Sequence, residues 1–155
     1  MNEEISKLIE EFESRLQEVK DKCEKTELEH GFDKGDDYWC IKSNGEVWRG
    51  TWDDAAYDRD VFAVGNAFKT KEEAEFEVER RKVLHELRMM GRPFKENAKN
   101  WVVSLDIYNN ISATYSVFSR YIYGDYYFDT EDEALEAVEK IGADRIKKYL
   151  FGIEG

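Results

Sequence analysis

Four aspartates follow the first aromatic-rich segment of the chain, and by type and spacing they come nearest to a chemical site. They are Asp53, Asp54, Asp58 and Asp60. Clustered carboxylates are the ligands that hard cations such as Ca²⁺ prefer. The segment lacks the glycine and the closing glutamate of a calcium-binding loop, so a solvated acidic loop is the better interpretation. We therefore expect no metal site.

The other residues that carry out chemistry in enzymes are few. The chain has two histidines, His30 and His85, and two cysteines, Cys23 and Cys40. No motif places a nucleophile beside a base, and no phosphate-binding loop or dinucleotide fingerprint occurs. The cysteine spacing indicates neither a disulfide framework nor a metal knuckle. We predict that the protein is not an enzyme and uses no cofactor.

The net charge of −12 is distributed unevenly. Acidic residues dominate residues 36–79 and 125–144, whereas residues 80–99 hold seven basic residues against two acidic ones. An acidic field repels nucleic acid and attracts basic partners, and it also keeps a protein soluble. We expect no direct nucleic-acid binding. No apolar run is long enough to cross a membrane, and the acidic start does not resemble a secretory signal, which predicts a cytoplasmic protein.

Residues 3–25 are predicted to form a helix with a narrow apolar stripe. The spacing of its apolar residues alternates between four and three, the heptad pattern of a coiled coil. These residues are Ile5, Ile9, Phe12, Leu16, Val19 and Cys23. The stripe must pack either on a second copy or on the chain's own domain. The strict spacing, followed by a polar linker at 27–36, favours a homodimer through residues 3–25.

An Asn44-Gly45 turn is predicted to join two strands, because Asn-Gly is typical of a two-residue hairpin turn. Such a turn pairs Ile41 with Trp48 and places four large apolar side chains on one face, which we interpret as core. These side chains are Trp39, Ile41, Trp48 and Trp52. The acidic segment from Asp53 to Gly65 is then predicted to be a loop.

Two helices are predicted to begin at capping boxes. The first follows Thr70 and ends near Gly91, and the second follows Thr130 and ends near Gly142. A second hairpin, with strands at 101–108 and 115–123 and a turn at Asn109-Asn110, lies between them. A last helix is predicted at 144–151.

The sequence around the two capping boxes is repeated about sixty residues apart. Phe68, Thr70, Glu73, Ala74, Val78 and Glu79 recur as Phe128, Thr130, Glu133, Ala134, Val138 and Glu139. Each helix also follows a β segment that begins Trp39-x-Ile41 or Trp101-x-Val103. The pattern predicts an internal duplication of a hairpin–helix unit, at 37–92 and 99–142.

The predicted fold class is α+β. Two hairpin–helix repeats would form one antiparallel sheet with both helices on one face. The expected organisation is an N-terminal helix at 1–26, a linker at 27–36 and a single domain at 37–155.

The segment from Gly65 through Arg80 and the ending from Arg145 to Gly152 resemble a group of small accessory proteins of phages and prophages of Gram-positive bacteria. The shared motif is Phe-x-Thr-x-Glu-Glu-Ala, here Phe68 to Ala74. The resemblance covers roughly residues 37–153 and consists of caps, turns and core positions, so it carries over no catalytic residue. It implies a phage accessory protein, and small proteins of that kind often block a host defence protein or sequester a signalling molecule.

Within that expectation, the two acidic runs suggest an inhibitor that binds a host defence protein directly. Their carboxylates would mimic the phosphate ladder of DNA and occupy a basic groove. The residues proposed to bind the partner are Asp53, Asp54, Asp58, Asp60, Asp129, Glu131, Asp132 and Glu136. The alternative to this interpretation is an ordinary solvated surface.

The basic segment suggests a different function, a sponge that sequesters a nucleotide immune signal. Arginines would pair with phosphates, and exposed aromatic rings would stack on the base. The residues of this hypothesis are Arg80, Arg81, Arg88, Arg92, Trp48, Trp52, Tyr57 and Tyr126. A structural or regulatory accessory protein is a third possibility, and an enzyme that degrades such a signal is disfavoured because the sequence lacks metal-ligand clusters.

Overall fold

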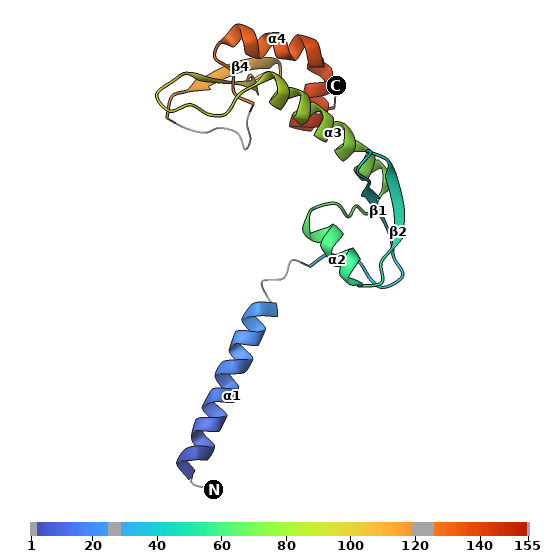
Figure 1. Ribbon diagram of the computed structural model, residues 1–155, viewed down its shortest axis with the longest axis vertical. Helices are drawn as coiled ribbons and strands as arrows, with labels where there is room; N and C mark the ends of the chain where they lie inside the picture. Colours follow the sequence, from blue (N-terminus) through green and yellow to red (C-terminus); the bar gives the residue numbers. More distant parts are fainter. Residues whose placement is uncertain (1–2, 25–28, 119–125, 155) are drawn as a thin grey trace.

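The computed structural model describes residues 3–24, 29–118 and 126–154, and it confirms the α+β class. Within these ranges the chain forms five helices and four strands (Figure 1). In chain order they are α1 (Glu3–Glu24), β1 (Asp37–Ile41), β2 (Val47–Thr51), α2 (Ala56–Ala63), α3 (Lys71–Met90), β3 (Asn100–Leu105), β4 (Ile111–Ser116), α4 (Glu131–Ile141) and α5 (Ala143–Phe151).

The helices α3 and α4 share two hydrogen bonds at their starts, and α3 has a third, from the Thr70 N–H to the Glu73 carboxylate at 3.3 Å, which completes its capping box. Thr70 Oγ1 accepts from Glu73 N at 3.1 Å, and Thr130 Oγ1 accepts from Glu133 N at 3.2 Å. Each glutamate carboxylate in turn accepts from the backbone N–H of the residue before its threonine. These bonds satisfy N–H groups that the first helical turn leaves without partners, and they confirm both predicted helix starts.

A second matched feature precedes each helix. Phe68 exchanges two backbone hydrogen bonds with Trp39, at 2.8 and 2.9 Å, and Phe128 exchanges two with Trp101, at 2.8 and 3.0 Å. We call β1, β2 and α3 the first unit, and β3, β4 and α4 the second unit. The shared hydrogen bonds make the two units locally alike, while their origin in a duplication stays a prediction.

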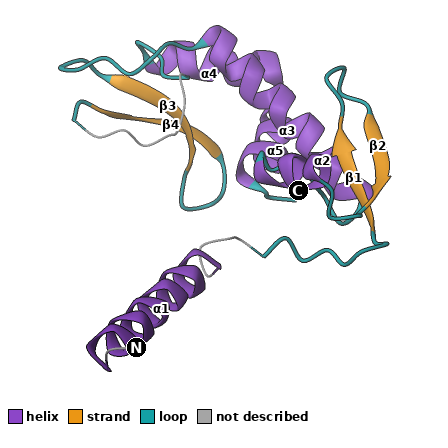
Figure 2. Ribbon diagram, turned by 60° about the horizontal axis from the view of Figure 1, so that its bottom comes forward, coloured by secondary structure: helices purple, strands orange, loops and turns teal. Residues whose placement is uncertain are grey.

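The prediction of a single sheet is wrong, because β1 pairs only with β2 and β3 only with β4 among the strands described. Phe68 and Phe128 occupy the outer edges of β1 and β3, so the hairpins do not pair with each other. The helix α3 has 20 residues, which at 1.5 Å per residue corresponds to about 30 Å. Figures 1 and 2 show the two hairpins at opposite ends of α3.

The predicted register of the first hairpin is also wrong, by one residue. Trp39 lies opposite Arg49, and Cys40 lies opposite Trp48. Of residues 42–46, Gly45 alone has a positive φ, 86°, and the Lys42 N–H donates to the Glu46 carbonyl at 2.8 Å. The turn therefore has three residues rather than two, with glycine in its left-handed position.

This shift changes which residues of β1 share the core face with Trp52: they are Tyr38 and Cys40, where Trp39 and Ile41 were predicted. Tyr38, Cys40 and Trp52 are buried, whereas Trp48 is exposed. Trp39 and Ile41 are half-buried on the other face.

The second hairpin is shorter than predicted. Its strand β3 ends at Leu105, and the turn extends from Asp106, whose N–H donates to the Asn110 carbonyl at 2.9 Å. The second strand, β4 at Ile111–Ser116, begins four residues before the predicted strand at 115–123 and shares only residues 115 and 116 with it. Residues 119–125 lie outside the described part of the chain.

The acidic segment contains a helix, α2, where a loop was predicted. The Asp58 carboxylate accepts hydrogen bonds from the backbone N–H groups of Asp53 and Ala55, at 2.9 and 3.2 Å, and so fixes the start of α2. Val61 anchors the other side of the helix in the core. The helix has only 8 residues, about two turns, so its periodicity is weak.

Two hydrophobic cores lie at the two ends of α3. The first is built from Phe32, Tyr38, Cys40, Trp52 and Val61. Phe32 belongs to the predicted linker, yet its ring stacks on that of Trp52 with centroids 5.0 Å apart. The second core is larger and joins the end of α3 to α4, α5 and β3. Its buried residues are Val83, Leu87, Val103, Tyr126, Phe128, Ala134, Ala137, Val138, Ile141 and Ile146.

The N-terminal helix α1 confirms the predicted helix at 3–25 and stands apart from both units (Figures 1 and 2). The linker predicted at 27–36 is described only from residue 29 onward.

Candidate functional site

One side of α1 carries an exposed apolar stripe. Its large apolar side chains are each between 46% and 67% exposed. They are Ile5, Leu8, Ile9, Phe12, Leu16 and Val19. The side chain of Cys23, the last residue of the predicted heptad pattern, lies outside the described part of the chain. A contiguous exposed stripe of this kind marks an interaction surface.

The structure separates the acidic residues that the sequence suggested as one surface. Asp53, Asp54 and Asp60 are exposed around α2, whereas Asp58 is buried and its carboxylate also accepts from the Tyr38 hydroxyl at 3.0 Å. Burial opposes the charge of Asp58, but its three hydrogen bonds outweigh this and hold its pKa below the usual value. Burial, together with the hydrogen bond to Asp58, raises the pKa of Tyr38. Asp58 is thus a structural residue.

The second acidic group lies on and before α4, at the other end of α3 from α2 (Figures 1 and 2). Glu131 and Asp132 are exposed in the first turn of α4. Asp129 forms ion pairs with Arg92 and Lys95 at 2.7 and 3.5 Å. Glu136 pairs with Lys140 at 2.8 Å. The two acidic groups therefore do not form one continuous surface.

Most of the arginines suggested for nucleotide binding already have acidic partners. Arg80 and Arg81 both pair with Glu77, at 2.6 and 3.0 Å. Arg88 is exposed near the end of α3. The hydrogen bond from Arg92 holds the pKa of Asp129 below its usual value. Arg80 and Arg92 therefore serve the fold in the single chain.

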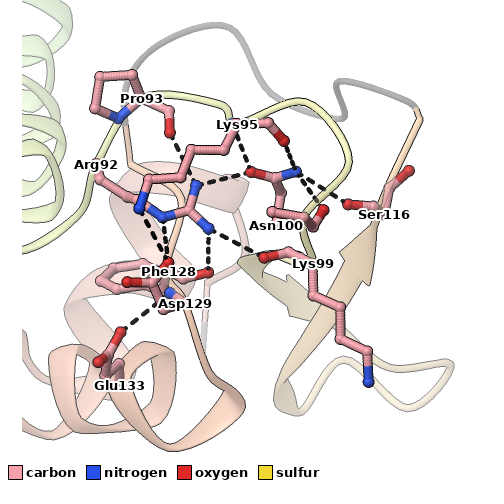
Figure 3. Close-up of polar contacts among 10 residues, drawn as sticks. Arg92, Pro93, Lys95, Lys99, Asn100, Ser116, Phe128, Asp129 and Glu133 are labelled. Atoms are coloured by element: carbon pink, nitrogen blue, oxygen red, sulfur yellow. Dashed lines mark hydrogen bonds and ion pairs between the residues drawn. The ribbon is translucent and has the colours of Figure 1, made fainter.

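Arg92 and Asn100 form a buried polar network between the end of α3 and the second hairpin (Figure 3). The guanidinium of Arg92 donates to Asn100 Oδ1 at 2.7 Å and to three backbone carbonyls. Asn100 is fully buried, and its amide donates to the carbonyls of Lys95 and Ala98, both at 2.8 Å. The network closes the loop that precedes β3.

The four aromatic residues of the nucleotide hypothesis divide into two kinds. Trp48 and Tyr57 are exposed and available for stacking. Trp52 and Tyr126, which the nucleotide hypothesis requires at the surface, are buried. The burial of Trp52 agrees with the core face that the sequence assigned to it.

A groove lies where the tip of the first hairpin meets α3. Its volume is ≈ 480 Å³, and every ionisable side chain that lines it is basic. We call it the basic groove, and its lining consists of Ile41, Lys42, Ser43, Asn44, Gly45, Val78, Arg81, Lys82 and His85.

A second groove of ≈ 490 Å³ lies on the other side of the same hairpin tip and has the opposite character. Glu46, Glu75 and Glu79 line it, with Lys71 as its basic residue. Val78 and Gly45 line both grooves. The hairpin tip therefore separates a basic from an acidic groove along α3.

No family model, no curated protein and no solved structure matches this chain. The resemblance to phage accessory proteins therefore stays a prediction. Of the helices described, none is long and apolar enough to span a membrane. In residues 3–24, 29–118 and 126–154, no group of three His, Cys, Asp or Glu side chains is arranged to hold a metal ion.

Sequence reasoning missed the basic groove although it identified a basic segment at 80–99. Arg81, Lys82 and His85 come from α3, but Lys42 comes from the tip of the hairpin. The recognisable signal was the pairing of a short hairpin with the helix that follows it. Locating the groove also requires the correct register of the hairpin, and the register predicted from the sequence was wrong by one residue.

Proposed function

We propose that this chain is a protein-binding protein and that α1 joins two copies of it into a dimer. The apolar stripe on α1 is the observation that supports this proposal. Five of its six residues follow the heptad spacing of a coiled coil, with Leu8 beside them, and all six are exposed between residues 5 and 19. A second copy offers the same stripe, so the surface is self-complementary.

Burial of the six apolar side chains would contribute a free energy comparable with the cost of association. Each of the six large side chains is about half exposed, so completing its burial contributes about 1 kcal/mol. Two helices together contribute on the order of 10 kcal/mol, which is comparable with the roughly 4–15 kcal/mol that association costs. Association is therefore expected, with modest affinity.

The resemblance to phage accessory proteins suggests the kind of partner. We propose a host defence protein that the dimer inhibits by direct binding in the host cytoplasm. Separation of the two acidic groups argues against a single DNA-like surface, so occlusion by the dimer is the mechanism we favour. The matched hydrogen bonds of the two units support an origin by duplication of one hairpin–helix unit.

Sedimentation equilibrium of the full chain tests the dimer. We expect the parent chain to sediment as a dimer at micromolar concentrations, and Ile9→Glu/Leu16→Glu to sediment as a monomer, because like charges in the seam repel. The control Ser14→Glu/Gln17→Glu adds the same charge outside the stripe and should leave the dimer intact. A monomeric parent chain, or equal masses for all three proteins, would refute the proposal.

Affinity capture from a bacterial lysate tests the partner. The parent chain should retain one host defence protein that the monomeric variant loses, and the purified pair should reassociate. Capture that is equal for the parent and the variant would show that the dimer is not the inhibitory form.

A further inference from the structure

The first and second units differ most where the hairpin tip meets the helix. Arg81 and Ile141 stand at the same distance along the chain from their N-cap threonines, Thr70 and Thr130. Ile141 is buried in the second core, whereas Arg81 lines the basic groove. A position that holds core packing in the second unit thus carries an exposed cation in the first.

The hairpins differ at the same place. Ile41 pairs with Val47 at the last step of the first hairpin, and Val103 pairs with Ala113 at the matching step of the second. The second hairpin continues for two further pairs, the last of which is Leu105 with Ile111, and Ile111 packs against the second core. The first hairpin stops short, so the space beside α3 stays open.

The two lysines of the basic groove are held only weakly by their acidic partners. Lys82 pairs with Glu79 at 2.6 Å and Lys42 with Glu46 at 3.7 Å, and at least half of each lysine side chain is exposed. Exposed pairs of this kind contribute little free energy. Arg81 donates its Nε to Glu77, which uses one of the five N–H groups of the guanidinium. An incoming anion can therefore recruit all three cations.

The acidic character of the whole chain makes this local composition informative. A net charge of −12 repels anions from the surface as a whole. Anion binding on such a protein must therefore be confined to a site where basic groups converge. Arg81, Lys82, Lys42 and His85 converge here from two elements that lie far apart in the sequence.

We propose that the basic groove binds a small organic phosphate of nucleotide size. Arg81 and Lys82 from α3 and Lys42 from the hairpin tip contact the phosphate, with Arg81 able to donate two parallel hydrogen bonds. Ile41 and Val78 form an apolar floor for the organic part of the ligand. The volume of ≈ 480 Å³ lies in the range of small-molecule sites, roughly 300–1,000 Å³.

This site is new relative to the residues that the sequence suggested for nucleotide binding. Of those arginines, only Arg81 lines the groove. The site is also independent of α1, so it stands or fails separately from the dimer.

Calorimetric titration of the full chain with adenosine 5′-monophosphate and with inorganic phosphate, each at 0.1 M salt, tests the proposal. We expect one nucleotide per chain, bound more tightly than inorganic phosphate because of the apolar floor. Arg81→Ile should weaken nucleotide binding about tenfold, the size expected for losing a hydrogen bond to a charged group. This variant carries the residue found at the matching position of the second unit, and its melting temperature verifies that it is folded.

The matched control is Lys71→Ile, which removes the same charge from α3 but in the acidic groove. It should bind the nucleotide like the parent chain. The proposal is overturned if neither ligand binds, if phosphate and the nucleotide bind equally, or if Arg81→Ile binds like the parent. Equal weakening by both variants would overturn it too, because that result indicates a general charge effect.

Discussion

In the second unit the hairpin is closed against its helix, and Val103, Val138 and Ile141 are all buried between them. In the first unit Ile41 and Val78, which match Val103 and Val138, line open grooves. The first unit buries Tyr38 and Trp52 instead, on the other face of its hairpin. The two units share their N-cap and Trp–Phe backbone hydrogen bonds. The comparison shows that such a unit can bury the contact between its hairpin and its helix for stability, or leave it open for binding.

The two units also differ in the buried polar residue that comes directly before Trp39 in the first unit and before Trp101 in the second. In the first unit this residue is Tyr38, whose hydroxyl donates one hydrogen bond to Asp58. In the second it is Asn100, which joins Arg92, the 95–98 loop and β4 (Figure 3). The second unit therefore depends more heavily on its polar residue.

The largest expected effect comes from introducing arginine, the residue at position 81 of the first unit, at the matching position 141 of the second unit. Ile141→Arg buries a cation without a partner in the second core, and we expect it to lower the free energy of unfolding by about 4 kcal/mol or more. Urea denaturation followed by circular dichroism measures this change. A loss below about 1 kcal/mol would mean that the contact between hairpin and helix is as open in the second unit as in the first.

The next largest effect is expected at the polar network of the second unit. Asn100→Ala leaves several buried donors and acceptors without partners, so we expect a loss of about 3 kcal/mol in urea denaturation. Glu96→Ala, an exposed change in the same loop, should have almost no effect. Equal stability of the two variants would show that the network of Figure 3 is dispensable.

A smaller effect is expected at Tyr38, which makes a single hydrogen bond through its hydroxyl. Tyr38→Phe should cost about 1–2 kcal/mol at neutral pH, because a hydrogen bond to a charged group is lost. The folded state lowers the pKa of Asp58, so this stabilisation is complete above the unfolded pKa, about 3.9, and disappears as pH falls through the folded pKa.

Urea denaturation at a series of pH values measures this dependence. The difference between the parent and Tyr38→Phe should shrink as Asp58 becomes protonated. A difference that stays constant down to the lowest pH at which both proteins fold would show that the hydrogen bond does not depend on the charge of Asp58.

The smallest effect is expected for the reverse exchange in the first unit. Arg81→Ile alters an exposed position, so its free energy of unfolding should stay within about 0.5 kcal/mol of the parent value. A loss comparable to that of Ile141→Arg would show that Arg81 holds the first unit together. Because Arg81→Ile is expected to leave the stability unchanged, any loss of ligand binding in this variant reports on the basic groove alone.

The parts of the fold that depend on local chemistry were predictable from the sequence. The caps at Thr70 and Thr130 and the α+β class follow from residues that lie close together in the chain. The first hairpin was recognised, but its register was not, because Asn-Gly fits a two-residue turn as well as a three-residue turn with Gly45 in its last position. This one-residue difference in register decided that Tyr38 is buried and that Trp39 is only half-buried.

The features that depend on distant residues could not be predicted. Two separate sheets arise because Phe68 and Phe128 occupy the edges that a common sheet would need. The sequence analysis placed Asp58 on an acidic surface. It could not show that Asp58 is buried, because the hydrogen bond with Tyr38 joins residues that are 20 apart in the chain. The basic groove needs Lys42 and Arg81 to line one surface, and only the folded chain brings these residues together.

The most direct test of the contrast between the two units is a ¹H–¹⁵N NMR titration of the full chain with adenosine 5′-monophosphate. We predict that backbone signals of residues 42–45 and 78–85 shift together with one dissociation constant, whereas residues 104–113 and 138–141 do not shift. Shifts spread over both units, or confined to residues outside the basic groove, would contradict the conclusion that the first unit is open for binding where the second is closed.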